Sequence, residues 1–347
     1  MTATPSKPWG GAQRQRLAPA GQVADAPVVA TIDLAAAMPA SQHSWPRWHF
    51  QHGPIDLVIQ AEGDVAAVDV AHEAAWRRFQ PLLGELVQEL PRLRQAVRTG
   101  ANPMQGAVAR RMWFACAALH QACHAAFITP MAAVAGAVAD ALIACYQRPG
   151  ITRAWINNGG DAALHLAPGA QLAVGLVADL GQFDDAALAR TLAGQALPDG
   201  RFVLAAHSPV RGLATSGWRG RSFSLGIADS VTVLAATSAQ ADAAATLVAN
   251  AVNLVHPGIQ RQPADSLKDD SDLGQRLVTV GVPALSADEA RQALTAGLAL
   301  AQKLRDAGLL HGALLSCQGS LASLPLARPL KWVSPSSSLV QTAPQPA

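Results

Sequence analysis

The pattern of apolar and polar residues divides the chain into a mainly helical part followed by a part rich in strands. Residues 48–61 consist of two extended runs on either side of Gly53-Pro54, which predicts an antiparallel pair of strands. Apolar residues then recur at helical spacing, which predicts helices at 65–97, 105–126 and 132–147. Pro81 and Pro91 are expected to break the first of these helices into pieces.

From Trp155 onward, short apolar and β-branched runs predict strands. These runs read AWINN, AALHL, QLAVGLV, RFVLAA, LATS, SFSLGI and SVTVLAA. Helices are predicted again at 239–253 and 287–305, and a strand at 312–317 follows the last of them. Strands in blocks, with helices grouped between them, predict an α+β fold in which mixed or antiparallel sheets pack against helices.

The two ends of the chain lack this periodicity. Residues 1–26 and 331–347 are rich in proline and small polar residues, and we expect both to be flexible extensions. The folded body at 27–330 is expected to be one domain, with two subdomains as the alternative. A chain of 347 residues with 50% hydrophobic residues can bury a sizeable core.

Charge and targeting signals exclude several classes of function. The net charge of +2 is too small to indicate a nucleic acid or an anionic membrane as partner. The first 30 residues lack the apolar core of a secretory signal, and the most apolar run, 128–146, is too short and too polar to span a membrane. Four cysteines in so long a chain do not make a disulfide framework. We therefore expect a cytoplasmic protein.

The first motif with candidate chemistry lies at 211–252. It begins with a turn and an arginine-rich bend that contain Thr215, Ser216, Gly217, Arg219 and Arg221. A β-branched strand follows and leads into a helix that carries Asp242 and Thr246. Positions i and i+4 share a helix face, and hard divalent ions prefer oxygen ligands, so this pair predicts a cation site. The arginines could contact a phosphate or carboxylate, or could be solvated.

The second motif consists of Asn157, Asn158, Gly159, Gly160 and Asp161. Two glycines allow the backbone to approach a ligand closely. The same sequence also forms a simple turn between two strands. Both interpretations can hold together, because a tight turn exposes the N–H groups that bind the polar edge of a ligand.

The third motif, ITPMAAVAGAVAD at 128–140, reads as the start of a helix. In this order, the three motifs resemble the ApbE superfamily of Mg²⁺-dependent FAD:protein FMN transferases, and look closest to its uncharacterised cytoplasmic branch in bacteria and archaea. The resemblance implies an ApbE-like fold. It also implies that Mg²⁺ is bound by Asp242, Thr246 and the carbonyl of Ala132, and that FAD or a related nucleotide lies between the Asn157–Asp161 and Thr215–Arg219 segments.

The chain departs from the transferase pattern at three places. Thr129 stands where the transferases have an aspartate, and Ala135 stands where they have a lysine. The histidine-containing segment that follows the TSG turn in the transferases is missing between Gly217 and Ser230. A missing cation and a missing histidine weaken pyrophosphate neutralisation and handling of the acceptor. We therefore expect the fold to carry over and the FMN-transfer reaction to be lost.

Structural interpretations of the same residues remain open at this stage. Ser238 could cap the helix, with Asp242 placed there only because its charge suits the positive helix end and with Thr246 packed inside. Asp229 could face the metal or close a turn. A further set, Cys116, His120, Cys123 and His124, shares one helical face. Four ligands on one straight helix cannot surround an ion, so we interpret this set as a core stripe.

Taken together, these motifs predict a cytoplasmic, Mg²⁺-dependent protein that binds a flavin or related nucleotide and transfers or cleaves it. The alternative is a non-catalytic accessory protein that uses the same cleft to bind a metabolite or a protein partner. A homo-oligomer is compatible with either function.

Overall fold

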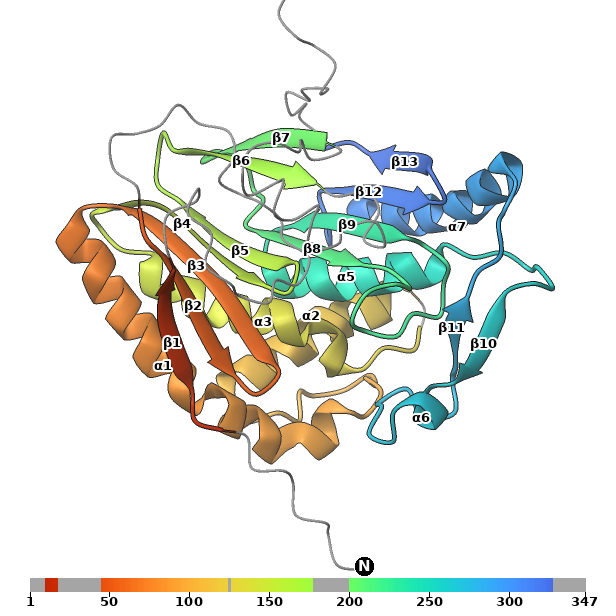
Figure 1. Cartoon of the computed structure of the whole chain (residues 1–347), viewed down its shortest axis with the longest axis horizontal. Helices are drawn as coiled ribbons and strands as arrows, with labels where there is room; N and C mark the ends of the chain where they lie inside the picture. Colours follow the sequence, from red (N-terminus) through yellow and green to blue (C-terminus); the bar gives the residue numbers. More distant parts are fainter. Residues whose placement is uncertain (1–9, 18–44, 124–125, 177–199, 327–347) are drawn as a thin grey trace, which may run out of the picture.

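A single antiparallel sheet runs through the molecule in the computed structural model, which describes residues 10–17, 45–123, 126–176 and 200–326 (Figure 1). Its strands, in spatial order, are β1 (Gln13–Leu17), β2 (Arg47–His52), β3 (Ile55–Gly63), β4 (Ile151–Asn158), β5 (Asp161–Leu166), β8 (Gly212–Ser216), β9 (Ser230–Ala235), β12 (Gly312–Cys317) and β13 (Ser320–Leu324). Every neighbouring pair in it is antiparallel. The α+β prediction is confirmed.

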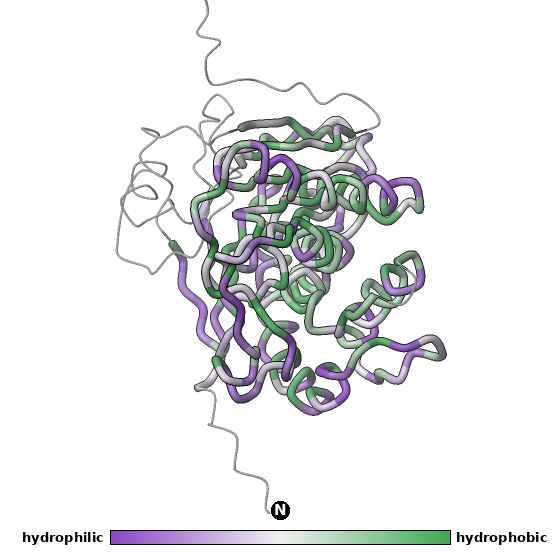
Figure 2. The backbone as a smooth tube through the Cα atoms, turned by 90° about the vertical axis from the view of Figure 1, so that its right-hand side faces the viewer, coloured by the Kyte–Doolittle hydropathy of each residue, from purple (hydrophilic) through white to green (hydrophobic). Residues whose placement is uncertain are grey.

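Helices cover one face of this sheet and enclose the larger of two hydrophobic cores. They are α1 (Val65–Leu93), α2 (Ala107–Ala122), the short 3₁₀ turn η1 (Pro130–Ala133), α3 (Val134–Ile143), the 3₁₀ turn η2 (Ala144–Tyr146), α5 (Ser238–Ala251) and α7 (Ala287–Asp306). Apolar stretches gather inside the molecule, and hydrophilic ones lie along edge strands and outer loops (Figure 2). Within the described residues, none of the helices combines the length and the apolar character needed to cross a membrane.

A smaller core lies on the opposite face of the sheet. There β6 (Gln171–Leu176) pairs with β7 (Gly200–Ala205) in an antiparallel ladder. Leu172 and Leu204 from this pair pack with Trp155, Leu164 and Leu213 from the main sheet. The central strands are therefore buried on both faces, which explains why their sequences are nearly continuous apolar runs.

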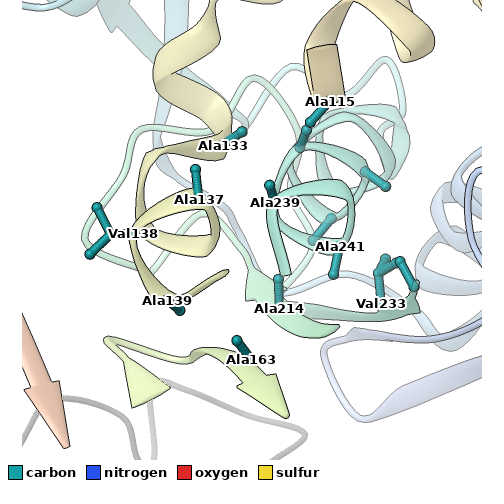
Figure 3. Close-up of a cluster of buried hydrophobic side chains, with 14 of the residues drawn as sticks. Ala115, Ala133, Ala137, Val138, Ala139, Ala163, Ala214, Val233, Ala239 and Ala241 are labelled. Carbon is teal, nitrogen blue, oxygen red and sulfur yellow. The ribbon is translucent and has the colours of Figure 1, made fainter. Parts of the chain in front are cut away.

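Small side chains allow α3 and α5 to lie unusually close to each other and to the sheet (Figure 3). A Cβ atom at Gly136 would lie 2.3 Å from the carbonyl oxygen of Ser238, and one at Gly212 would lie 2.1 Å from the backbone nitrogen of Ser238. The start of α5 is thus held between α3 and β8 by backbone contacts that only glycine permits. This contact fixes the position of the helix that carries Asp242.

The expected pair of strands at 48–61 is confirmed as β2 and β3. The expected break in the first helix is wrong, because α1 continues through Pro81 and Pro91. Both prolines lie on the exposed side of α1, where water can bond the carbonyl groups that proline leaves without a partner. Burial of the opposite face holds the helix together.

The SFSLGI segment, expected to be a strand, has no strand structure. The side chain of Asn250 explains this difference, because its Oδ1 accepts hydrogen bonds from the N–H of Leu225 at 2.8 Å and from Ser224 Oγ at 3.1 Å. Bonds from a helix side chain replace the ladder that a strand would need.

A second small sheet was not predicted. It consists of β10 (Gln260–Pro263) and β11 (Leu277–Gly281), with the short helix α6 (Ala264–Leu267) between them. We call residues 260–281 the β10–β11 arm.

Residues 13–17 lie within the segment expected to be an extension, yet they form the edge strand β1. Arg14 explains the docking of this strand. Its guanidinium pairs with Glu73 at 2.5 Å and lies 5.3 Å from the ring centre of Trp76. The remaining expectations for the two extensions concern residues 1–9, 18–26 and 331–347, which lie outside the described residues.

Candidate functional site

The predicted site residues converge where four elements meet. These elements are the turn between β4 and β5, the end of β8, the start of α3 and the first turns of α5. The polar residues that line this junction are buried or half-buried. Segments that are far apart in the sequence therefore form one polar site within an otherwise apolar interior.

The NNGGD segment forms a tight turn whose asparagines tie it to its surroundings. Gly159 and Gly160 have φ values of 67° and 110°, which side-chain-bearing residues rarely adopt. Asn157 Oδ1 accepts the N–H of Gly160 at 2.9 Å. Asn158 Nδ2 donates to the carbonyl of Ala135 at 3.1 Å. The turn interpretation is confirmed, and the same contacts fasten the turn to α3.

Asp161 lies at the point where the pairing between β5 and β8 ends. These two strands pair in register at only two positions, Ala162 with Leu213 and Ala163 with Gly212. Just beyond this short ladder, Asp161 Oδ1 accepts the N–H of Thr215 at 3.3 Å. The carboxylate of Asp161 thus replaces a backbone carbonyl as hydrogen-bond acceptor at the seam of the sheet, which is the short ladder between β5 and β8.

Asp242 projects from α5 toward the start of α3. Its Oδ2 accepts the N–H of Gly136 at 2.9 Å, and the N–H of Ala135 also donates to its carboxylate. Thr246 follows one turn later on the same side and is half-buried. The carboxylate therefore connects two helices and is not a solvated residue near a helix end.

The start of α5 has its own capping groups. Thr237 is the N-cap and accepts the N–H of Gln240 at 3.2 Å. Asp140 accepts the N–H groups of Ser238 and Ala239 at 3.0 and 2.9 Å. The interpretation of Ser238 as the cap is therefore wrong. Because the helix is already capped, Asp242 is not needed for that purpose.

Asp161 and Asp242 form a pair of carboxyl groups that resist ionisation together. Burial raises the pKa of Asp161 well above its ordinary value, the charge of Asp242 raises it further, and Arg221 partly offsets both effects. Burial also raises the pKa of Asp242 to about 7, even though backbone N–H groups donate to its carboxylate. Asp242 keeps some exposed area, but protein atoms surround its carboxylate, so burial outweighs the hydrogen bonds to it.

The two arginines of the bend point to different places. A Cβ atom at Gly159 would lie 1.5 Å from Arg221 Nη2, so the guanidinium of Arg221 lies directly against the NNGGD turn. Arg219 Nε instead lies 3.9 Å from Asp229, and its guanidinium lies 5.0 Å from the ring centre of Trp218. The sequence indicated both arginines but not that Arg221 crosses to the turn.

The turn predicted at 215–217 is wrong, because Thr215 and Ser216 pair with β9 as the end of strand β8 and the chain turns only at 218–220. Thr215 Oγ1 lies 2.9 Å from Thr232 Oγ1, and Ser216 is half-buried at the end of β8. A Cβ atom at Gly217 would lie 2.3 Å from the carbonyl oxygen of Asp229, so this position requires glycine. The loop that begins at Gly217 therefore ends beside its starting point, where Gly217 packs against the backbone of Asp229.

Asp229 is buried beneath this loop. Its carboxylate accepts hydrogen bonds from Trp218 Nε1 at 3.4 Å and from the N–H of Gln318. Of the two roles left open for Asp229, the structure therefore shows that it closes a turn.

The donor groups at the junction suit a small hard cation. Within the described ranges, no three side chains of His, Cys, Asp and Glu form a cluster that could hold a metal ion. An ion held by Asp242 would have to complete its shell with hydroxyl and carbonyl oxygens, water or phosphate, which is how Mg²⁺ is usually bound. Thr246 lies on the same helix, and η1, with the half-buried Ala132, packs against α5.

The cysteine–histidine stripe of α2 makes separate contacts. Cys116 is fully buried, and its Sγ donates to the carbonyl of Thr129 at 3.3 Å. His120 Nδ1 lies 2.9 Å from the carbonyl of Ala126, and Cys123 caps the helix end. His124 lies outside the described residues.

A cavity of about 450 Å³ opens on the helical side, between α2 and the start of α5. It is lined by Ala107, Arg110, Arg111, Phe114, Ala115, Thr237, Ala239 and Gln240. None of the residues predicted for the site is in this lining. The cavity and the junction are thus different places, although α5 contributes to both.

Comparison with known proteins identifies several UPF0280 proteins as relatives. A UPF0280 protein of Methanosphaerula palustris is 31% identical over 214 residues, which cover 61% of this chain and 79% of that protein. UPF0280 proteins of Methanospirillum hungatei and Methanothrix thermoacetophila are 36% and 32% identical, over 37% and 48% of this chain and 46% and 62% of their own lengths. The chain thus spans about half the length of the first of these two. The family model described as AbpE bacteria matches residues 35–323. Because this match covers most of the chain, the protein belongs to that family.

Proposed function

We propose that this protein binds Mg²⁺ together with a flavin or related nucleotide at the junction of α3, α5 and the NNGGD turn, and transfers or cleaves that ligand. The observation that carries the proposal is the pair of buried carboxyl groups, Asp161 and Asp242. Burial disfavours the charged form of both groups, the charge of Asp242 disfavours it further at Asp161, and Arg221 partly offsets the charge of Asp161. A divalent cation would remove this electrostatic cost.

Each residue has a defined part in this proposal. Asp242, Thr246 and the carbonyl of Ala132 would hold the ion. Bound Mg²⁺ supplies a Lewis acid for a pyrophosphate oxygen. The guanidinium of Arg221, which lies directly against the NNGGD turn, would bind the anionic part of the ligand, and the Gly159-Gly160 backbone would lie beside it.

The resemblance to the ApbE superfamily supports the choice of flavin over other nucleotides. The three motifs that carry the resemblance contribute to one junction although they lie far apart in the sequence, as the hydrogen bond from the N–H of Gly136 to Asp242 illustrates (residue separation 106). A cytoplasmic location and assembly into a homo-oligomer are further parts of the proposal.

The second candidate function is a non-catalytic protein that binds a metabolite or partner enzyme in the same cleft. This candidate is favoured by Ala135, which has no cationic side chain. Only its backbone contacts the site, through its N–H to Asp242 and its carbonyl to Asn158. A cation next to the transferred phosphate is a common requirement of phosphoryl-type chemistry. A protein that lacks this cation would bind the ligand without turning it over.

A thermal-shift screen with FAD, FMN and nucleotides, each with and without Mg²⁺, tests the proposal. A ligand present at 100 times its Kd stabilises the folded state by about 2.7 kcal/mol. We expect a rise in melting temperature with FAD or a related nucleotide that is larger when Mg²⁺ is present. If no nucleotide raises the melting temperature under either condition, the proposal is wrong. If binding occurs but no product forms, the second candidate is the correct one.

The affinity for Mn²⁺, used as a probe of the cation site, is expected to rise with pH from 5 to 8. Because burial raises the pKa of Asp242 to about 7, an ion that binds below that pH must displace a proton. The expected change is roughly tenfold per pH unit below pH 7, as for one released proton. Isothermal titration calorimetry in buffers of different ionisation enthalpy measures both the affinity and the proton release.

The ion-free protein provides the complementary measurement. Unfolding lowers the pKa of Asp242 to its ordinary value of 3.8, so between this pH and about 7 the folded state holds a proton that the unfolded state has lost. The contribution of Asp242 to stability therefore falls as the pH rises through this window and is constant above it. Asp242→Asn should remove this component. An Mn²⁺ affinity that does not change between pH 5 and 8 would contradict the raised pKa.

A further inference from the structure

Thr129 is held by a carboxylate from a distant segment. Its side chain is buried with 2% of its surface exposed, and its hydroxyl donates to Asp272 Oδ2 across 143 positions of sequence. Thr129 is the residue that precedes η1, but its side chain does not cap that turn. The hydroxyl is instead used to fasten the turn to the β10–β11 arm.

The backbone of Thr129 is fixed as firmly as its side chain. Its carbonyl accepts the N–H of Ala132 at 3.1 Å and the thiol of Cys116 at 3.3 Å. Pro130, the next residue, restricts the backbone further. The direction of the η1 turn, and with it the direction of the Ala132 carbonyl, therefore depends on how Thr129 is held.

The arm that carries Asp272 is anchored at several points. Asp270 pairs with Arg94 from the end of α1 at 2.7 Å. The N–H of Thr279 donates to the carbonyl of Ser224 at 2.8 Å. The guanidinium of Arg276 lies 3.2 Å from the ring centre of Phe127, two residues before Thr129. These contacts hold the arm in one position, so that Asp272 lies next to the residue that precedes η1.

The thiol of Cys116 is influenced by the charges of both Asp272 and Asp242. Cys116 lies beneath η1, and burial raises the pKa of its thiol. The charges of Asp242 and Asp272 both raise that pKa further. One buried thiol is therefore within electrostatic reach of both carboxylates. Because Asp272 already accepts the Thr129 hydroxyl and completes no metal-binding cluster within the described residues, a direct ligand role is not assigned to it.

We propose that Asp272 is a positioning residue of the cation site, which holds the Thr129 hydroxyl and thereby aims the Ala132 carbonyl at the ion bound by Asp242. This inference rests on the proposed function. Partners of metal ligands that lie outside the coordination shell orient those ligands, and their loss typically weakens metal affinity by about 10- to 100-fold.

Isothermal titration of the full chain with Mn²⁺ at pH 8 tests this role. Asp272→Ala and Thr129→Val should each weaken Mn²⁺ binding by at least about tenfold. Asp272→Asn keeps an oxygen acceptor and Thr129→Ser keeps the hydroxyl, so both should retain most of the affinity. The double variant Asp272→Ala/Thr129→Val should bind no more weakly than either single variant, because both changes remove the same bond.

Asp269→Ala is the matched control. It removes one negative charge from an exposed position of the same arm and leaves the Thr129 bond intact, so its Mn²⁺ affinity should equal that of the parent. If the parent binds Mn²⁺ and Asp272→Ala binds it equally well, the inference is wrong and the proposed function stands. The inference is also wrong if Asp269→Ala weakens binding as much as Asp272→Ala. If the parent binds no Mn²⁺, both proposals fail. Should Asp272→Ala not fold, the comparison of Thr129→Val with Thr129→Ser decides the question.

Discussion

Replacing Asp242 by alanine or asparagine is expected to abolish binding of Mg²⁺ and Mn²⁺ while leaving the fold intact. A direct ligand should contribute more than the roughly 10- to 100-fold in affinity typical of residues that only orient ligands. The fold should survive because Thr237 and Asp140 already cap α5, but the alanine variant should melt at a lower temperature because the N–H groups of Ala135 and Gly136 lose their acceptor. Asparagine also keeps an oxygen acceptor for the N–H of Gly136. Calorimetric titration measures the affinity, and circular dichroism measures the melting temperature.

Two other carboxylates serve as controls for this experiment. Asp288 lies on the surface with 90% of its side chain exposed, and Asp288→Asn should change neither ion binding nor stability. Asp140→Asn should lower the melting temperature, because it disturbs two hydrogen bonds at the start of α5, but should leave ion binding intact in the folded protein. Equal Mn²⁺ affinity in Asp242→Asn and the parent would exclude Asp242 as a ligand. Unfolding of Asp242→Asn would assign it a structural role.

Incubation with FAD, Mg²⁺ and an acceptor peptide that contains a flavinylation motif is expected to give little or no FMN transfer to threonine. Ala135 presents no cationic side chain, and the loop between Gly217 and Ser230 carries no histidine. Loss of one preorganised contact to developing charge typically costs 10²- to 10³-fold in rate, so two losses should bring transfer close to background. Mass spectrometry of the peptide measures the covalent product.

The same incubation also distinguishes loss of transfer from loss of binding. The Gly159-Gly160 turn and the guanidinium of Arg221 that lies against it are present in this chain, so nucleotide binding should persist when transfer does not. An active transferase assayed in parallel shows that the peptide is competent. Robust FMN attachment by this protein, lost in Asp242→Ala, would restore the assignment as a transferase.

The parts of the fold and site that the sequence predicts are those encoded in short continuous segments. The NNGGD turn depends on two adjacent glycines, and the strand at 312–317 depends on a single apolar run, so both follow from local chemistry. The turn predicted at 215–217 fails because the pairing of Thr215 and Ser216 with β9, a distant partner, extends the strand to the end of that segment. Local patterns do not specify the partners of these segments, which is why the role of Asp229 stayed open until its bonds to Trp218 and Gln318 were known.

The contacts that the sequence did not indicate act across long separations. Asp140 caps a helix 98 positions away, and Asp272 reaches Thr129 over 143 positions. Neither lies in a recognisable spacing relative to its partner, because the separation depends on the path of the chain between them. The edge strand β1 was missed for the same reason, since the contacts of Arg14 with Glu73 and Trp76 dock it, and its own pattern is polar.

The short ladder between β5 and β8 has a consequence for how the molecule holds together. One half of the sheet, β1–β5, meets the other half, which consists of β8, β9, β12 and β13, through two paired positions and the hydrogen bond from the N–H of Leu164 to the carbonyl of Arg211. The next contact along this seam, from Thr215 to Asp161, weakens or strengthens with the charge on a carboxyl group. The strength of the join between the two halves at this seam is therefore linked to the charge of Asp161, and a ligand that neutralises this charge would also alter the join.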